Sequence, residues 1–445
     1  MGDKVTETSS TRRYVIAVSD RRHQGCGNVT ETGSTSTGVP VVAGHQASLD
    51  GIRAVAAFAV LIFHVAMEAG TALEPGFLGG VLSRGEIGVP IFFTLSGLLL
   101  YRPWAAEVLI GDRAPDTGRY LWKRFFRIIP AYWLVVAVAL LLWGEAHRSD
   151  PWTWVQMLFL VHTYDTSPWW FGLGPKGLGQ MWSLAVELTF YLTLPLMAAA
   201  LRWFALRGGP DLRARARRLL IGLAVFGGLS YVYTIFEYFP EYRPWMNVWL
   251  PRSWTFFVPG MALAVLTVWA RAADGPVRRL CAALAASWGT LWVIAGLAYL
   301  IAATPVTGPR FVGLGGIWTA FYEQGLYTLI AFCLVAPAAL EPGGPTRLHA
   351  VLGGRLMSYL GRISYGVFLW QFVVIYLWYD FTGQEPWTGN LILNLAAVGA
   401  LTVALAGLTY RYVEEPARRL IRFIPQSAGG AGPGSPKATA LRQNA

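Results

Sequence analysis

Long apolar stretches constrain the fold of this chain more than any other feature of its sequence. A helix needs about 20 mostly apolar residues to cross the hydrocarbon core of a membrane, and ten stretches approach that length. Hydrophobic residues make up 54% of the chain and charged residues only 14%, which excludes an ordinary soluble globular protein. We expect membrane-spanning helices at residues 53–70, 86–101, 128–143, 180–201, 218–236, 253–270, 282–303, 318–340, 358–379 and 390–410.

The positions of the basic residues predict how these helices are oriented. Cytoplasmic loops retain Lys and Arg, and with a cytoplasmic N-terminus most of the 36 basic residues fall on the inner side. We therefore predict an all-α, polytopic helical bundle of the cell membrane with both termini in the cytoplasm. This topology also explains the net charge of +11, so no nucleic-acid partner is expected.

Two polar segments flank the apolar region. Residues 1–46 are rich in Ser, Thr and Gly and contain no apolar run long enough for a signal peptide, and residues 426–445 are similarly polar. We interpret both as disordered cytoplasmic tails of a single transmembrane domain, residues 47–425. The three cysteines are scattered and indicate neither a disulfide nor a zinc site.

The longest predicted outer loop, residues 144–179, contains the short apolar piece WVQMLFLVH. This piece is too short to cross the membrane. We interpret it as an interfacial or re-entrant segment and as a candidate lid over a site.

The first span combines an arginine at its start with a histidine in its interior. Arg53 and His64 are 11 residues apart, which puts them on one helix face about 16 Å apart along the axis. An ionisable side chain in hydrocarbon is costly and indicates function. His64 is a candidate general base, because a neutral imidazole can take a proton from a hydroxyl nucleophile. The alternative is a structural imidazole that bonds a neighbouring helix or pairs with Glu68.

Arginines gather at the predicted cytoplasmic ends of the first three spans. A guanidinium binds phosphate oxygens in a bidentate geometry, so this cluster is a candidate site for the phosphates of a nucleotide. The alternative is that these arginines only anchor the helices at the inner membrane surface. The residues are Arg53, Arg102, Arg124 and Arg127.

Polar residues also lie inside other apolar spans. Ser96 and Gly97 would allow either a substrate or simply another helix to approach closely. Ser183 and Glu187 are four residues apart in MWSLAVELTFY and share a helix face. Glu187 and His64 lie at matching predicted depths, roughly 10 Å from the outer ends of their spans. Glu187 is therefore expected either to orient His64 by accepting the imidazole N–H or to bind the hydroxyls of an acceptor.

Five motifs in this order resemble those of the membrane acyltransferase-3 family. They are LDGIRAVAAFAVLIFH, GVPIFFTLSGLLLYR, RFFRIIPAYW, WSLAVELTFY, and GRISYGVFLWQ followed by YVEEPARR. The resemblance extends from about Leu49 to Ile421. It implies an integral-membrane enzyme that transfers acyl groups, often acetyl, from acyl-coenzyme A to hydroxyls of carbohydrates and natural products.

The resemblance also implies roles for individual residues. The catalytic histidine of the family matches His64, its paired arginine matches Arg53, and the carboxylate of the fourth motif matches Glu187. Two positions depart from the family pattern. Pro90 stands where the family often has an acidic or small residue, and Gln371 stands where it usually has histidine, so Gln371 is given no catalytic role. The arginines of the second and third motifs match Arg102, Arg124 and Arg127.

The expected reaction uses acyl-coenzyme A as a donor substrate, with its phosphates on the arginine cluster and its pantetheine arm along the face of Arg53 and His64. No permanently bound cofactor and no metal are expected. His64 would deprotonate the acceptor hydroxyl, and Ser96, Ser183 or a backbone amide would stabilise the oxyanion. The alternative function is a transporter or flippase for a polar or lipid-linked substrate, in which His64 and Glu187 relay protons or bind the substrate.

Overall fold

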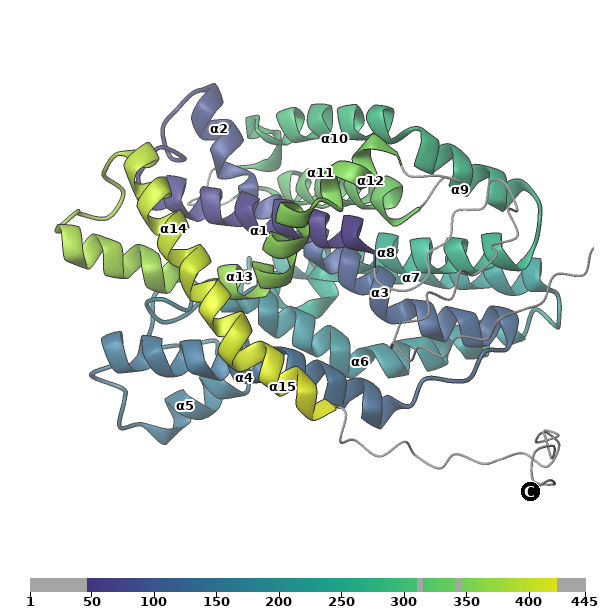
Figure 1. Cartoon of the computed structure of the whole chain (residues 1–445), viewed down its shortest axis with the longest axis horizontal. Coiled ribbons are helices and arrows are strands. Elements are labelled where there is room, and N and C mark those ends of the chain that lie inside the picture. Colours follow the sequence, from purple (N-terminus) through teal and green to yellow (C-terminus); the bar gives the residue numbers. More distant parts are fainter. Residues whose placement is uncertain (1–45, 310–314, 341–345, 422–445) are drawn as a thin grey trace, which may run out of the picture. The chain divides into compact units, whose positions relative to one another are not determined.

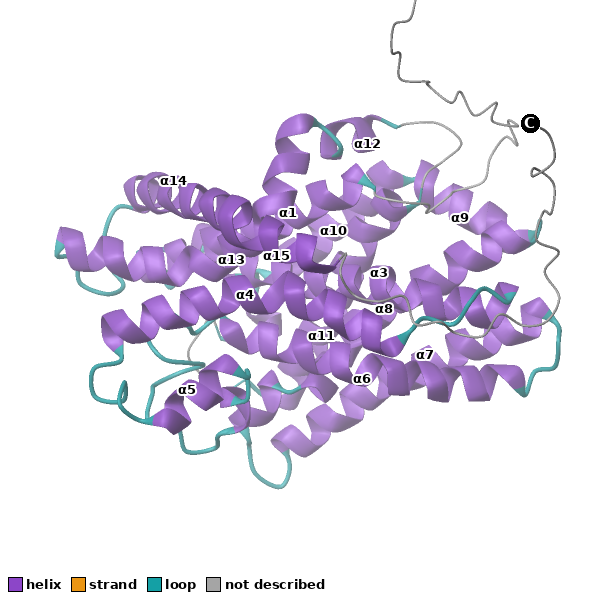
Figure 2. Ribbon diagram, turned by 60° about the horizontal axis from the view of Figure 1, so that its bottom comes forward, coloured by secondary structure: helices purple, strands orange, loops and turns teal. Residues whose placement is uncertain are grey.

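The computed structural model describes residues 46–309, 315–340 and 346–421 of the 445-residue chain. Every regular element within these ranges is a helix (Figures 1 and 2), which confirms the predicted fold class. The predicted disordered tails lie outside the described residues, apart from residue 46.

Nine helices in the described ranges are long and apolar enough to cross a membrane. They confirm nine of the ten predicted spans, although α4 begins well before the predicted start at residue 128. The nine are α1 (Ala47–Glu68), α3 (Gly88–Ile110), α4 (Thr117–Trp143), α6 (Met181–Leu206), α7 (Leu212–Tyr238), α8 (Leu250–Ala272), α11 (Ile317–Ala339), α13 (Arg355–Thr382) and α14 (Leu391–Thr409).

The remaining predicted span, residues 282–303, is broken. It corresponds to α9 (Pro276–Ala286) and α10 (Trp288–Ala302), which meet at an angle of 68°. Ser287 and Gly289 stand at the break, and Gly/Ser pairs are a recognised cause of sharp helix bends. Apolar composition alone does not reveal such a bend, so the sequence predicted one continuous helix.

Short helices occupy the connections between the spans. The helix α5 is eight residues long, too short to cross a membrane, as predicted for this loop. It is held against α4, where the Trp133 indole donates to the carbonyl of Leu158 at 3.0 Å and the Tyr132 hydroxyl donates to the carbonyl of Met157. The short helices are α2 (Phe77–Ser83), α5 (Pro151–Leu158), α12 (Arg347–Leu352) and α15 (Glu415–Leu420).

Two close helix contacts form the centre of the bundle. The helix α1 packs along α13, and α3 packs along α8 (Figure 1). At the second contact a Cβ atom on Gly97 would collide with the carbonyl oxygen of Phe257, and one on Gly260 would collide with that of Thr94. Gly97 therefore serves helix packing, which was one of the two roles predicted for this part of the second span.

Candidate active site

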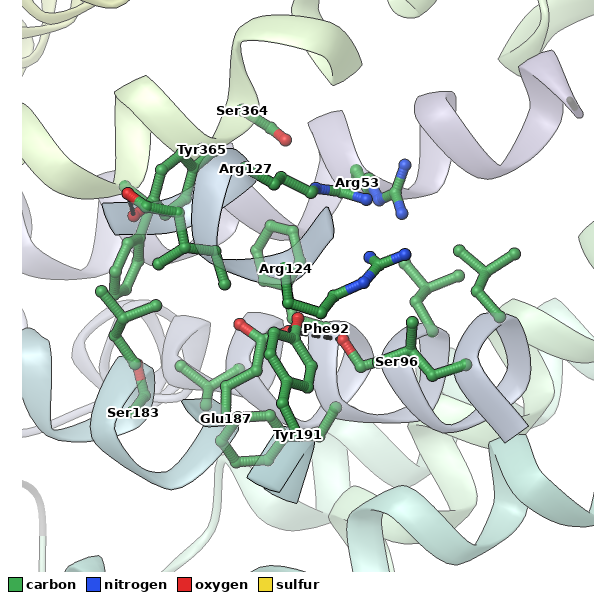
Figure 3. A pocket seen from close by; sticks show the side chains of 18 residues that line it. Arg53, Phe92, Ser96, Arg124, Arg127, Ser183, Glu187, Tyr191, Ser364 and Tyr365 are labelled. Carbon is green, nitrogen blue, oxygen red and sulfur yellow. Dashed lines mark hydrogen bonds between the residues drawn. The ribbon is translucent and has the colours of Figure 1, made fainter. Parts of the chain in front are cut away.

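A cavity of about 90 Å³ lies among α1, α3, α4, α6 and α13 (Figure 3). Its wall combines charged and hydroxyl side chains with apolar ones. It brings together six of the eight site residues predicted from the sequence and leaves out His64 and Arg102. The six are Arg53, Ser96, Arg124, Arg127, Ser183 and Glu187.

Three guanidinium groups face this cavity from two helices. Arg124 and Arg127 are three residues apart and share one face of α4, two to three turns from its N-terminus. Arg53 comes from α1 and donates to the carboxylate of Asp50 at 3.1 Å. The Nε of Arg124 is buried and has no hydrogen-bond partner within the described residues. These three side chains line one cavity, as a phosphate site requires.

Glu187 lies in the same cavity and is held there by two hydroxyl groups. Ser96 of α3 donates to its carboxylate at 2.5 Å, and Tyr191 donates to the same oxygen, Oε1. Ser183 also lines the cavity, but its hydroxyl donates to the carbonyl of Gln180 at 3.1 Å. Both serines line the cavity, although each hydroxyl already has an acceptor in the protein, and their role towards a substrate stays a prediction.

His64 is bound by α13 rather than by a carboxylate. Its Nδ1 lies 3.1 Å from Oε1 of Gln371. The half-buried imidazole ring contacts the rings of Phe63 and Phe372, at centroid distances of 4.9 and 4.3 Å. Of the two partners in the structural alternative, the neighbouring helix is the one observed, because Gln371 belongs to α13. The pairing with Glu68 is not formed, and that carboxylate accepts from Tyr376 at 3.2 Å.

The structure does not form the hydrogen bond to His64 that was one of the two roles expected for Glu187, and its other role, acceptor binding, stays a prediction. Each side chain has its own partners, and α3 contacts both α1 and α6. The sequence predicted that Glu187 and His64 lie at the same depth in the membrane, but depth does not show which helices are neighbours.

Sequence reasoning also left out Gln371, which contacts His64. Its only signal was its place in the motif where the family usually has histidine.

Arg102 lies outside the lining of the cavity. It is on α3, near Arg271 of α8, and these two positive charges repel each other. The structure therefore brings together three of the four arginines predicted to bind phosphate.

Comparison with known proteins identifies the family. Residues 46–411 match a family model described as an acyltransferase domain. The chain is 27% identical to a peptidoglycan O-acetyltransferase of Listeria monocytogenes over 399 residues, which cover 84% of this chain and 56% of the relative. It is 26% identical to Nodulation protein 10 of Rhizobium leguminosarum over 402 residues, which cover 85% of this chain and 94% of the relative.

The chain spans little more than half the length of the Listeria relative. No solved structure matches it. Because the family match extends over most of the sequence and the helices are those of a multi-pass membrane protein, the chain belongs to this acyltransferase family.

Proposed function

We propose that this membrane protein transfers an acetyl or other short acyl group from acyl-coenzyme A to a hydroxyl of a carbohydrate or glycosylated natural product. The family supports acyl transfer. The name of the Listeria relative supports O-acetylation and a carbohydrate polymer as the acceptor. We propose the identity of the donor, acyl-coenzyme A, and the class of the acceptor, a carbohydrate or glycosylated natural product.

The arginine cavity is the observation that carries the choice of donor. Arg53, Arg124 and Arg127 offer guanidinium groups inside the bundle, where an uncompensated positive charge is costly. A phosphate group supplies the opposite charge and accepts bidentate hydrogen bonds from guanidinium. Coenzyme A carries phosphates at one end and its thiol at the other end of a long pantetheine arm. Its phosphates can therefore bind the arginines while its thioester reacts at a distant residue.

The distance between Arg53 and His64 fits the distance between the phosphates and the thiol of coenzyme A. Arg53 and His64 share one face of α1 about 16 Å apart along the axis. With the phosphates at the arginine cavity, the pantetheine arm would run along α1 and bring the thioester to the imidazole. His64 is only half-buried, so a hydroxyl acceptor can reach it.

The reaction then follows from general base catalysis. The imidazole takes the hydroxyl proton as the acceptor oxygen attacks the thioester carbonyl. The carbon–sulfur bond breaks, the oxygen ester remains on the acceptor, and the thiolate of coenzyme A takes the proton back from the imidazolium. No group of the protein is consumed.

Release of free thiol tests this function. Purified protein in detergent would be incubated with acetyl-coenzyme A and either a peptidoglycan fragment, a simple oligosaccharide or a glycosylated natural product. We expect thiol release to depend on acceptor, and mass spectrometry to find an acetyl ester on it. A transporter or flippase would release no thiol with any acceptor, which would refute the proposal.

A further inference from the structure

Gln371 connects His64 to the backbone of α13 through a fully buried amide. The side chain is 0% exposed. Its Oε1 lies 3.1 Å from Nδ1 of His64, and its Nε2 donates to the carbonyl of Phe368 at 3.1 Å. One amide group therefore contacts both the imidazole and a fixed point on the neighbouring helix.

The chemistry of these partners fixes which way the amide points. The carbonyl oxygen of Phe368 can only accept a hydrogen bond, so the NH₂ group of Gln371 must face it. The amide oxygen then faces His64 and can only accept. A neutral imidazole carries its proton on one of its two nitrogens, so Nδ1 must be the nitrogen that carries it.

We propose that Gln371 is a positioning residue that holds His64 in the Nδ1–H tautomer and so keeps the lone pair on Nε2. Nε2 makes no hydrogen bond within the residues that the structure describes, and the ring is half-buried. Contacts with Phe63 and Phe372 restrict rotation of the ring. Nε2 is thus the nitrogen available to the acceptor hydroxyl, an inference that rests on the proposed acyl transfer.

The amide also determines where the proton stays during the reaction. It neither gains nor loses a proton near pH 7, so it cannot accept the Nδ1 proton when the ring becomes an imidazolium. The proton taken from the acceptor hydroxyl therefore remains on Nε2 of His64 until the thiolate of coenzyme A removes it. Gln371 remains an acceptor for Nδ1–H throughout and stabilises the imidazolium.

Nitrogen NMR tests the tautomer without any need for activity. Protein labelled with ¹⁵N-histidine would be studied without donor or acceptor at neutral pH. The chain has six histidines, and the signals of His64 are those that disappear in His64→Ala. We expect a protonated Nδ1 and an unprotonated Nε2 in the wild type, and a loss of this preference in Gln371→Leu. A wild-type protein protonated at Nε2, or an unchanged tautomer in Gln371→Leu, would overturn the proposal.

Kinetics test whether the tautomer matters for the reaction. We expect Gln371→Leu to lower kcat by about 100-fold with little change in KM for acetyl-coenzyme A, because the base is misplaced while donor binding is kept. Gln371→Glu keeps an acceptor oxygen for Nδ1–H but loses the donor to Phe368, so it should keep the tautomer and lower kcat less than Gln371→Leu does. An altered tautomer with an unaltered kcat would refute the positioning role.

A control variant shows whether the changes in tautomer and kcat come from Gln371 itself or from removing any buried glutamine. Gln324 of α11 is also 0% exposed, and it donates to the carbonyl of Arg252 at 3.1 Å. Gln324→Leu should leave the His64 tautomer unchanged. If wild-type His64 is protonated at Nδ1 but no acyl transfer is found with any acceptor, the proposed tautomer is confirmed and the proposed function is refuted.

Discussion

Arg53 of α1 and Arg127 of α4 face the same cavity, and their positive charges repel each other across it (Figure 3). Arg124 lies beside them and is repelled by Arg127 as well. The carboxylates of Asp50 and Glu187 offset part of this repulsion. An anion bound in the cavity would offset more of this repulsion.

Replacing an arginine of the cavity by lysine should weaken the binding of coenzyme A while preserving the charge. Lysine cannot form the bidentate contact of a guanidinium with phosphate. We expect Arg53→Lys and Arg127→Lys each to raise the Kd for coenzyme A about tenfold or more, as measured by isothermal titration. Arg202→Lys is the control, because Arg202 is exposed and pairs with Glu107 on the surface. Unchanged affinity in both cavity variants would leave these arginines without a role in donor binding.

Glu187→Gln should tighten the binding of coenzyme A and destabilise the empty protein. The carboxylate repels phosphate when the donor is bound, but it offsets the repulsion between arginines when the cavity is empty. Titration with coenzyme A and the unfolding temperature without it measure the two effects. Ser96→Ala removes a hydrogen bond to Glu187 but no charge, so it should change the affinity less. A rise in the KM of the acceptor alone would instead support acceptor binding by Glu187.

His64→Ala should abolish acyl transfer without preventing folding or membrane insertion. General base catalysis contributes about 10²- to 10⁴-fold to a rate. The imidazole makes a single hydrogen bond within the described residues, to Gln371, so its removal should cost about 1–3 kcal/mol and leave the protein folded. Thiol release in the presence of acceptor measures the effect. His147→Ala is a matched control, because His147 lies in the loop after α4 and its ring packs on Trp169. Turnover near the wild-type rate in folded His64→Ala would contradict the mechanism.

The loop between α4 and α6 should lose stability in mild acid because of His162. This residue lies in a short 3₁₀ turn outside the candidate spans, and burial lowers the pKa of its imidazole to about 4. The unfolded imidazole has a pKa of about 6.5, so the unfolded state binds the proton first as the pH falls. Stability is complete above pH 6.5 and declines towards pH 4, with a loss of about 2 kcal/mol by pH 5.

The variant His162→Leu tests whether protonation of His162 causes the loss of stability in acid. Neither ring nitrogen of His162 has a hydrogen-bond partner within the described residues, so His162→Leu removes the titration without breaking a hydrogen bond. We expect the unfolding temperature of His162→Leu to fall less between pH 7 and pH 5 than that of the wild type. An identical fall in both proteins would show that other groups cause the acid sensitivity.

Most of the fold could be predicted from the sequence, because hydropathy follows directly from the composition of each segment. Nine spans were located in this way. The bend at Ser287 was missed, since two short apolar helices and one long one have the same composition. The early start of α4 was missed because its first turns carry Arg119, Lys123 and Arg124, which lower the hydropathy although the backbone remains helical.

The candidate site could be predicted only in part. Spacing along one helix identified the shared face of Arg53 and His64. Clustering at the ends of the spans selected the arginines of α4, and a carboxylate inside an apolar span selected Glu187. Contacts between helices were not available from the sequence. For that reason a bond between Glu187 and His64 was one of the two expected roles, whereas the structure joins Glu187 to Ser96, and Gln371 was overlooked.

The break between α9 and α10 has a consequence for the surrounding lipid. The 15 residues of α10 extend about 22 Å, whereas the hydrocarbon layer is about 30 Å thick. With α10 upright, the angle of 68° leaves α9 close to the plane of the membrane. Lipids beside an upright α10 would have to shorten or tilt their chains, and we expect the bilayer to thin locally there. Reconstitution should therefore favour lipids with short acyl chains, and an unfolding temperature independent of chain length would show that no such mismatch exists.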